Sequence, residues 1–166
     1  IFALQDNKAS NVFHSSDGGA NWEETGSRPG DKGKQAWYDL VLEVHRQDPK
    51  VIITGSVDMY RSYDGGKHWD KVIDWLQYNK GDRAQHADQH ACVFDHSDIR
   101  KVWVGNDGGI SMTGDLGHTW RKRSHGILAS QPNDITSHPN FPMVCGGGLQ
   151  DNGTWVSYGG LTWHYM

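Results

Sequence analysis

The sequence predicts an all-β fold, a β-propeller of four-stranded antiparallel blades, of which about four are present in the 166 residues. Three observations predict it. A phrase of about eight residues recurs, and the tryptophans that end its copies are residues 22, 69, 120 and 163. Repeats of about 40–50 residues with several strands each are typical of propeller blades. Glycine (21 residues) and tryptophan (8 residues) are frequent, which suits short strands joined by tight turns.

Each repeat has the same rhythm of short strand-like segments separated by turn residues. The first repeat, a partial blade over residues 1–27, has three such segments and lacks an innermost strand. The other three repeats, over residues 35–75, 86–124 and 131–166, have four segments each. The expected strands are 1–4, 11–14, 22–25, 38–44, 51–55, 59–62, 69–73, 90–94, 102–105, 110–113, 120–123, 134–137, 143–146, 154–157 and 162–165.

The incomplete first blade leaves open how the ring closes. Propellers close by pairing strands from the two chain ends, because open sheet edges promote aggregation. The chain is either a piece of a larger propeller, with the remaining blades as partners, or a four-bladed ring that closes imperfectly. The piece is favoured, since propellers have about 4 to 8 blades.

Bulk composition excludes several classes of function. Lys and Arg number 16 and Asp and Glu number 20, so the net charge of −4 favours neither nucleic acid nor an anionic membrane surface. No apolar run approaches the roughly 20 residues of a membrane-spanning helix. No signal peptide is visible, but the first residue is Ile1, so this says nothing about export. Cys92 and Cys145 are expected to be buried free thiols, with a single bridge as the alternative.

The repeated phrase, Ser/Thr-x-Asp-x-Gly-x-x-Trp, is the Asp-box, also called the BNR repeat. The residues that define its three near-intact copies are Ser15, Asp17, Gly19 and Trp22; Ser62, Asp64, Gly66 and Trp69; and Thr113, Asp115, Gly117 and Trp120. A fourth copy, from Ser157 to Trp163, is one residue shorter and has no Asp.

Ordinary turn chemistry accounts for each position of the box. We expect a hairpin between the third and fourth strands of each blade, in which the carboxylate accepts hydrogen bonds from backbone N–H groups. The glycine allows a positive φ, and the tryptophans are expected to bury large surfaces between blades. The boxes are therefore predicted to be structural and not catalytic.

Four further stretches resemble those of secreted bacterial BNR-repeat proteins, which are often described as glycosyl-hydrolase-like or sialidase-like. They are Gln35–Leu40, His86–Ala91, Val104–Ile110 and Gly148–Thr154. Asp-boxes also occur in sialidases, family 74 xyloglucanases, sortilin-type receptors and photosystem assembly factors. The resemblance implies a propeller fold and a secreted, extracellular setting.

Sialidases carry a Phe-Arg-Ile-Pro-like motif, from which the Arg28-Pro29 context departs, so sialidase activity is not expected. Asp107-Gly108-Gly109 is similar to the Asp-x-Gly-Gly context of a catalytic Asp in xyloglucanases.

The boxes also locate a second set of aspartates. Six residues before the box Ser/Thr lie Asp107 and Asp151, Ser56 takes this place in the second repeat, and Asp6 lies near it in the first. This is the turn between the second and third strands, so Asp6, Asp107 and Asp151 are expected to gather at one rim of the channel. Asp107 and Asp151 are candidate acid/base residues. Asp6 is a candidate ligand-binding residue. Candidates for stacking on sugar rings are Trp37, Trp103 and Trp155. The alternative is that Asp-Gly pairs merely form good turns.

The segment His86-x-Asp88-x-His90 is a candidate metal site. Alternation would place all three side chains on one face of a strand, if the strand extends that far. Two imidazoles and a carboxylate suit a divalent transition metal. The alternative is a polar channel lining in which Asp88 orients a histidine.

Two functions follow from these patterns. The first is an extracellular binding or scaffold module for a glycan or an extracellular protein, with no cofactor. The alternative is a fragment of a xyloglucanase-like glycoside hydrolase that uses carboxylates at the propeller mouth. The fold alone does not decide between them, because propellers host unrelated functions.

Overall fold

The computed structural model describes residues 1–5, 11–26, 29, 35, 37–77, 85–127 and 129–166. The chain divides into two compact units, Ile1–Ile127 (unit 1) and Leu128–Met166 (unit 2), each described by itself below. Apart from the short 3-10 helix η1 (Trp75–Gln77), every regular element among the described residues is a β-strand. No helix in this part of the chain is long and apolar enough to cross a membrane.

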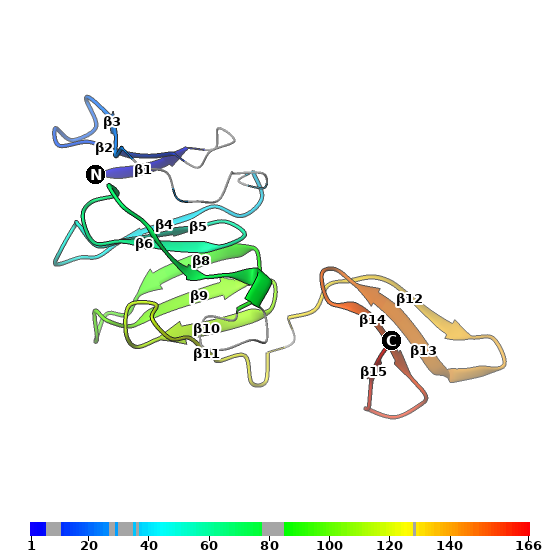
Figure 1. Ribbon diagram of the computed structural model, residues 1–166. Helices are drawn as coiled ribbons and strands as arrows, with labels where there is room; N and C mark the ends of the chain where they lie inside the picture. Colours follow the sequence, from blue (N-terminus) through cyan, green and yellow to red (C-terminus); the bar gives the residue numbers. More distant parts are fainter. Residues whose placement is uncertain (6–10, 27–28, 30–34, 36, 78–84, 128) are drawn as a thin grey trace. The chain divides into compact units, whose positions relative to one another are not determined.

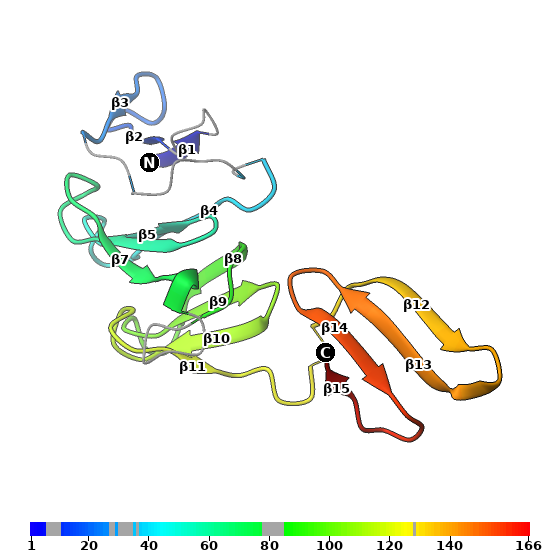
Figure 2. The same ribbon diagram turned by 45° about the vertical axis from the view of Figure 1, so that its right-hand side comes forward.

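Unit 1 holds three antiparallel sheets, here called blades 1 to 3, in which each strand pairs with the next one along the chain. Blade 1 comprises β1 (Phe2–Gln5), β2 (Asn11–His14) and β3 (Glu23–Glu24). Blade 2 comprises β4 (Val41–Val44), β5 (Ile52–Gly55), β6 (Met59–Ser62) and β7 (Asp70–Ile73). Blade 3 comprises β8 (Gln89–Phe94), β9 (Val102–Asn106), β10 (Gly109–Thr113) and β11 (Arg121–Lys122). The blades lie side by side in chain order (Figures 1 and 2), and the first strands of blades 2 and 3 contact each other.

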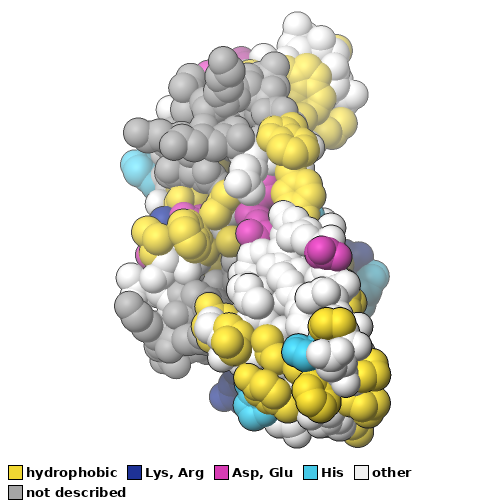
Figure 3. All heavy atoms as spheres, turned by 90° about the vertical axis from the view of Figure 1, so that its right-hand side faces the viewer, with side chains coloured by type: hydrophobic (Ala, Val, Ile, Leu, Met, Phe, Trp, Pro, Cys, Tyr) yellow, Lys and Arg dark blue, Asp and Glu magenta, His cyan; other side chains and the backbone are white. Residues whose placement is uncertain are grey.

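Unit 2 is a single four-stranded antiparallel sheet, blade 4. It comprises β12 (Pro132–His138), β13 (Phe141–Leu149), β14 (Gly153–Ser157) and β15 (His164–Tyr165). Hydrophobic side chains gather on the surface of this sheet (Figure 3). The large apolar side chains exposed on it include Ile135, Phe141, Met143, Leu161 and Tyr165.

The hydrophobic core of the described chain lies where blades 2 and 3 meet. It is built from residues of their strands and of the positions directly beside those strands, as expected for sheets packed face to face. Its members are Val41, Val51, Ile53, Met59, Val72, Ile73, Phe94, Val102, Val104 and Trp120. Because both blades contribute side chains, the two sheets form one packed body.

The three near-intact boxes share one hydrogen-bond pattern. The Ser or Thr hydroxyl donates to the Asp carboxylate in each box, at 2.8 Å for Ser15, 2.9 Å for Ser62 and 2.6 Å for Thr113. The same hydroxyl accepts the N–H of the second glycine at 2.8 to 2.9 Å. Each carboxylate also accepts a backbone N–H from the residue four positions later. The hairpin is thus closed by side chains that are local in sequence.

These hydrogen bonds shift the acidity of the box carboxylates. The backbone N–H of Asn21 lowers the pKa of Asp17, and the side chain of His68 lowers that of Asp64. Burial raises the pKa of Asp115, but the hydrogen bonds from Thr113 and Thr119 outweigh it, so this pKa falls to about 2. Each box is therefore held together by the charged form of its Asp.

The box turn needs a second residue with positive φ that the sequence pattern did not mark. The defining glycines Gly19, Gly66 and Gly117 have φ between 91° and 98°, and the residue before each also lies in the left-handed region. In the first two boxes that residue is a glycine, but in the third it is Leu116, with φ of 56°. A side chain in this region costs roughly 1 kcal/mol. Leu116 packs against the core, which offsets that cost.

The expected burial of the box tryptophans is wrong for two of them. Trp120 is 6% exposed and donates its Nε1–H to Val72 O of β7 at 3.0 Å, so the preceding blade covers it. Trp69 is half-buried. Trp22 and Trp163 are 42% and 45% exposed. Among the described sheets, none precedes blade 1 in unit 1 and unit 2 is a single sheet, so neither the Trp22 nor the Trp163 indole has a preceding blade within its own unit.

The first strand of blade 2 is shorter than the sequence suggested. It begins at Val41 and not at Tyr38, because the backbone N–H groups of Tyr38 and Asp39 donate to Gln35 O at 2.7 and 3.1 Å. This turn leaves Trp37 and Tyr38 exposed beside the sheet. Cys92 and Cys145 are both free thiols and are half-buried.

Candidate functional site

The turn between β9 and β10 presents Asp107 at one end of blade 3. Asn106 and Gly109 face each other across this turn, and the Asn106 side-chain oxygen accepts the N–H of Gly108 at 3.0 Å. A Cβ on Gly108 would lie 2.6 Å from the Cβ of His86, so only glycine fits there. The Asn-Asp-Gly-Gly sequence therefore forms a tight two-residue turn whose Asp points out of the sheet.

His90 reaches this turn from the neighbouring strand. Its Nε2 lies 2.7 Å from Asp107 Oδ1. The register of β8 against β9 shifts between Gln89 and Ala91, so His90 is the extra residue of a β-bulge. Bulges re-aim side chains, and they are common beside functional sites. The His90 side chain is 36% exposed and that of Asp107 is 16% exposed, so the pair faces solvent at its imidazole end.

Two aromatic residues of the turn before β4 extend the surface that His90 and Asp107 form. The Tyr38 ring meets the His90 ring edge to face, with centroids 4.8 Å apart. The Trp37 ring lies 5.7 Å from the Tyr38 ring and is 77% exposed. Trp37, Tyr38, His90 and Asp107 thus form one continuous surface, here called the aromatic–acid patch. It brings together residues of blades 2 and 3.

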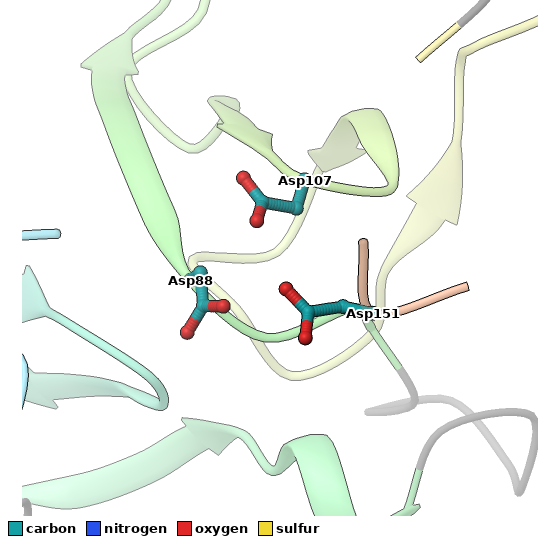
Figure 4. A group of neighbouring side chains, drawn as sticks. All are labelled: Asp88, Asp107 and Asp151. Carbon is teal, nitrogen blue, oxygen red and sulfur yellow. The ribbon is translucent and has the colours of Figure 1, made fainter. Parts of the chain in front are cut away.

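A buried polar layer supports the patch. Asp88, 6% exposed, accepts the Gln35 side-chain N–H at 3.1 Å, and one of its carboxylate oxygens lies within 4.8 Å of one from Asp107 (Figure 4). Gln89 is fully buried, and its side chain bonds the carbonyl of His86 at 2.7 Å. The Gln89 N–H donates to Ser56 O of blade 2 at 2.9 Å. These bonds fix the start of β8, from which His90 projects.

One hydrogen-bonding atom of the patch is left over. Asp107 Oδ2 is buried and has no hydrogen-bond partner among the described residues. A buried acceptor of this kind costs stability unless water or a ligand satisfies it. The exposed part of the patch is therefore the two aromatic rings and the His90 imidazole, while Asp107 Oδ2 lies beneath them.

The predicted metal site does not form as expected. The strand β8 begins at Gln89 and Asp88 has a positive φ of 62°, so alternation does not carry His86, Asp88 and His90 onto one strand face. Among the described residues, these three do not gather closely enough to share one ion. The physical reason is the turn at Asp88 and the bulge at His90, which send the side chains in different directions.

Trp103 lies away from the patch. It is four residues before Asp107 on β9, about 13 Å at the usual rise per residue. Its Nε1–H donates to Asp95 Oδ2 at 3.0 Å and so secures the turn between β8 and β9. The structure gives Trp103 a structural contact in place of a free face. The candidate Asp6 lies outside the described residues.

The remaining predicted residues belong to unit 2. Asp151, also drawn in Figure 4, is exposed in the turn between β13 and β14, with φ of 55°. Trp155 donates its Nε1–H to Asn152 O at 2.8 Å and packs edge to face on Tyr165. Trp155, Trp163, Ile135 and Leu149 line a pocket of about 470 Å³. Asp107 belongs to unit 1 and Asp151 to unit 2, so the expected approach of these two carboxylates stays a prediction.

Sequence reasoning did not assign a role to Tyr38, Gln35 or Gln89. Tyr38 was placed in a strand because it precedes an apolar run. A usable signal was the neighbouring Trp37-Tyr38 pair: two large aromatic residues in succession face both sides of a strand, which suits a turn better than a half-buried sheet. The roles of Gln35 and Gln89 depend on contacts between blades, which no local pattern encodes.

Comparison with known proteins identifies the type of fold. No family model matches the chain, and no curated protein matches it. The structure is similar to the GH74 xyloglucanase from Xanthomonas campestris, with a TM-score of 0.60 and 17% identity over 93% of this chain and 27% of that chain. It is also similar to an ancestral GH74 enzyme, with a TM-score of 0.53 and 12% identity over 99% of this chain and 22% of that chain. The structure is similar as well to the GH74 enzyme of Niastella koreensis, with a TM-score of 0.51 and 16% identity over 99% of this chain and 22% of that chain.

These likenesses establish an all-β propeller of antiparallel blades, as the sequence predicted. The chain spans about a quarter of the length of the solved structures that it matches. At identities of 12 to 17%, the likeness is one of fold.

Proposed function

We propose that this chain is an extracellular glycan-binding propeller module and that it binds sugar at the aromatic–acid patch. The observation that carries the proposal is the unbroken contact series from Trp37 through Tyr38 and His90 to Asp107. It joins an exposed aromatic surface to an imidazole that a carboxylate holds in place.

The chemistry of the patch matches that of a sugar. Apolar C–H faces of a pyranose ring pack against aromatic rings, and Trp37 offers the largest exposed ring of the patch. The sugar's hydroxyl groups need hydrogen-bond partners at fixed positions, and the exposed His90 imidazole, held by Asp107, provides one. The backbone beneath them is held by buried hydrogen bonds, so little ordering is needed on binding.

Neutral β-glucan oligosaccharides are the first probes, because the similar solved structures include a xyloglucanase. Isothermal titration calorimetry with xyloglucan oligosaccharides should give saturable binding by the intact chain. Trp37→Ala should weaken it at least about tenfold, since it removes the main stacking surface.

Trp22→Ala is the matched control, because Trp22 is also an exposed tryptophan but lies in the box of blade 1. It should bind as the unchanged chain does. Equal affinity of the Trp37→Ala and unchanged chains, or no binding to any neutral glucan tested, would refute a glycan site at this patch.

One observation favours a second candidate function, glycoside hydrolysis. Asp88 and Asp107 have carboxylate oxygens within 4.8 Å of each other, near the spacing of about 5–5.5 Å in retaining glycosidases. In that role one carboxylic acid would protonate the leaving oxygen while the other carboxylate attacks the sugar. Release of reducing sugar from xyloglucan, abolished by Asp107→Asn, would support it. Binding without any release would favour the binding module alone.

A further inference from the structure

We infer that Asp107 is a positioning residue that holds His90 in one tautomer and thereby presents His90 Nδ1 as the hydrogen-bond acceptor for a ligand hydroxyl. This inference rests on the proposed glycan site and names the group within it that selects the ligand. The ligand class is a neutral polyol whose hydroxyl donates to the imidazole.

The first step is the bond between the two side chains. An ionised carboxylate only accepts hydrogen bonds, so at 2.7 Å the proton must lie on His90 Nε2. In a neutral imidazole, the other nitrogen then carries a lone pair. The Asp107 carboxylate thus determines that Nδ1 is the accepting atom.

The second step is the freedom of that atom. No described residue bonds His90 Nδ1, and the imidazole is 36% exposed. The ring cannot turn away freely, because Tyr38 packs edge to face against it and the bulge fixes its backbone. Nδ1 is therefore a preoriented acceptor on the same surface as the exposed Trp37 ring.

The third step concerns the support of Asp107 itself. The carboxylate projects from a turn that Gly108 and Asn106 hold tightly, and Gly108 lies directly against His86. Its position does not depend on the ligand. In a His–Asp pair of this kind, replacing Asp by Asn keeps the geometry but reverses the tautomer, because the amide donates where the carboxylate accepted.

The test combines a spectroscopic readout with binding. In the intact ¹⁵N-labelled chain, at a pH well above the ordinary imidazole pKa of about 6.5, long-range ¹H–¹⁵N spectra should show the His90 proton on Nε2. Asp107→Asn should move the proton to Nδ1 and weaken binding of xyloglucan oligosaccharides about tenfold. Asp98→Asn, which makes the same charge change at the turn between β8 and β9, should alter neither. The tautomer of the unchanged chain needs no variant, so the test survives if Asp107→Asn fails to fold.

The outcomes separate this inference from the proposed function. A proton on Nδ1, or on both nitrogens, in the unchanged chain would overturn it. A reversed tautomer in Asp107→Asn with unchanged affinity for the oligosaccharide would also overturn it. In that case, loss of binding in Trp37→Ala would still support the proposed glycan site. If the unchanged chain binds no oligosaccharide, the proposed function and the acceptor role both fail, and only a reversed tautomer in Asp107→Asn would then show that Asp107 orients His90.

Discussion

Blades 2 and 3 each have a hydrogen-bonded pair at the turn after the second strand, but only one pair faces solvent. In blade 2, Ser56 donates to Asp39 at 2.9 Å, and the two residues are 1% and 0% exposed. In blade 3, the extra residue His90 bonds Asp107 at 2.7 Å, with the imidazole 36% exposed. Each pair ties the turn after the second strand to the start of the first strand. The pair at this turn is thus buried in one blade and open to solvent in the next.

Two local features produce the difference. The turn at Gln35 precedes β4 and directs Asp39 inward, where the Ser56 hydroxyl meets it. In blade 3 the bulge adds one residue to β8 and turns His90 outward. The bulge therefore leaves a half-exposed histidine at this turn without altering the strand order.

The largest expected effect tests whether both pairs belong to one packed body. Trp120→Ala should lower the free energy of unfolding by about 3–5 kcal/mol, because it empties a buried site between blades 2 and 3 and removes the bond to Val72 O. Urea denaturation followed by fluorescence and by circular dichroism would measure it. The matched variant Trp22→Ala should cost about 1 kcal/mol or less. Equal losses in the two variants would mean that blades 2 and 3 do not form the common core.

A smaller effect separates the two pairs directly. Ser56→Ala should cost about 1.5–3 kcal/mol of unfolding free energy, because it removes a buried hydrogen bond to a carboxylate. Asp107→Ala should cost under about 1 kcal/mol, since solvent reaches the imidazole that it leaves behind. Glycan affinity should show the reverse order, with only Asp107→Ala weakening it. If Ser56→Ala proved the milder change in denaturation, the comparison between the blades would be wrong.

Local chemistry made the blade pattern and the boxes predictable. Ser15, Asp17 and Gly19 close their turn with each other, so eight residues contain the whole motif. The turn at Asp107-Gly108 is local in the same way. The blade count and the strand order therefore followed from spacing.

The site was less predictable because its contacts join distant residues. Tyr38 meets His90, and Gln35 bonds Asp88, across 52 and 53 positions of the chain. The bulge at His90 depends on how β8 pairs with β9. Trp103 was a candidate for sugar stacking, and only the placement of Asp95 shows that its ring secures a turn. The exposure of Trp22 likewise depends on what lies beside a blade and not on the box itself.

The smallest expected effect concerns the two boxes of the compared blades. In blade 3, the described hydrogen-bond partners of the Asp115 carboxylate are Thr113 and Thr119, and the charge of His118 adds a smaller effect that also lowers its pKa. Its pKa is lowered to about 2, so its charged form contributes stability above the ordinary value of 3.8. That contribution is lost as the pH falls through 3.8 toward about 2, because the unfolded state binds the proton first.

Asp115→Asn should therefore destabilise the chain at pH 6, and the difference from the unchanged chain should shrink steadily below pH 4. Thermal unfolding at several pH values between 6 and 2.5 would measure this. In blade 2, Asp64 bonds the titratable His68 at 2.5 Å, so the same series on Asp64→Asn should also respond to the charge of that imidazole. His68→Gln in the chain that keeps Asp64 would isolate the contribution of the imidazole charge. A pH-independent cost of Asp115→Asn would show that the carboxylate's charge does not hold the turn, and that the box depends on the hydroxyl and the glycines alone.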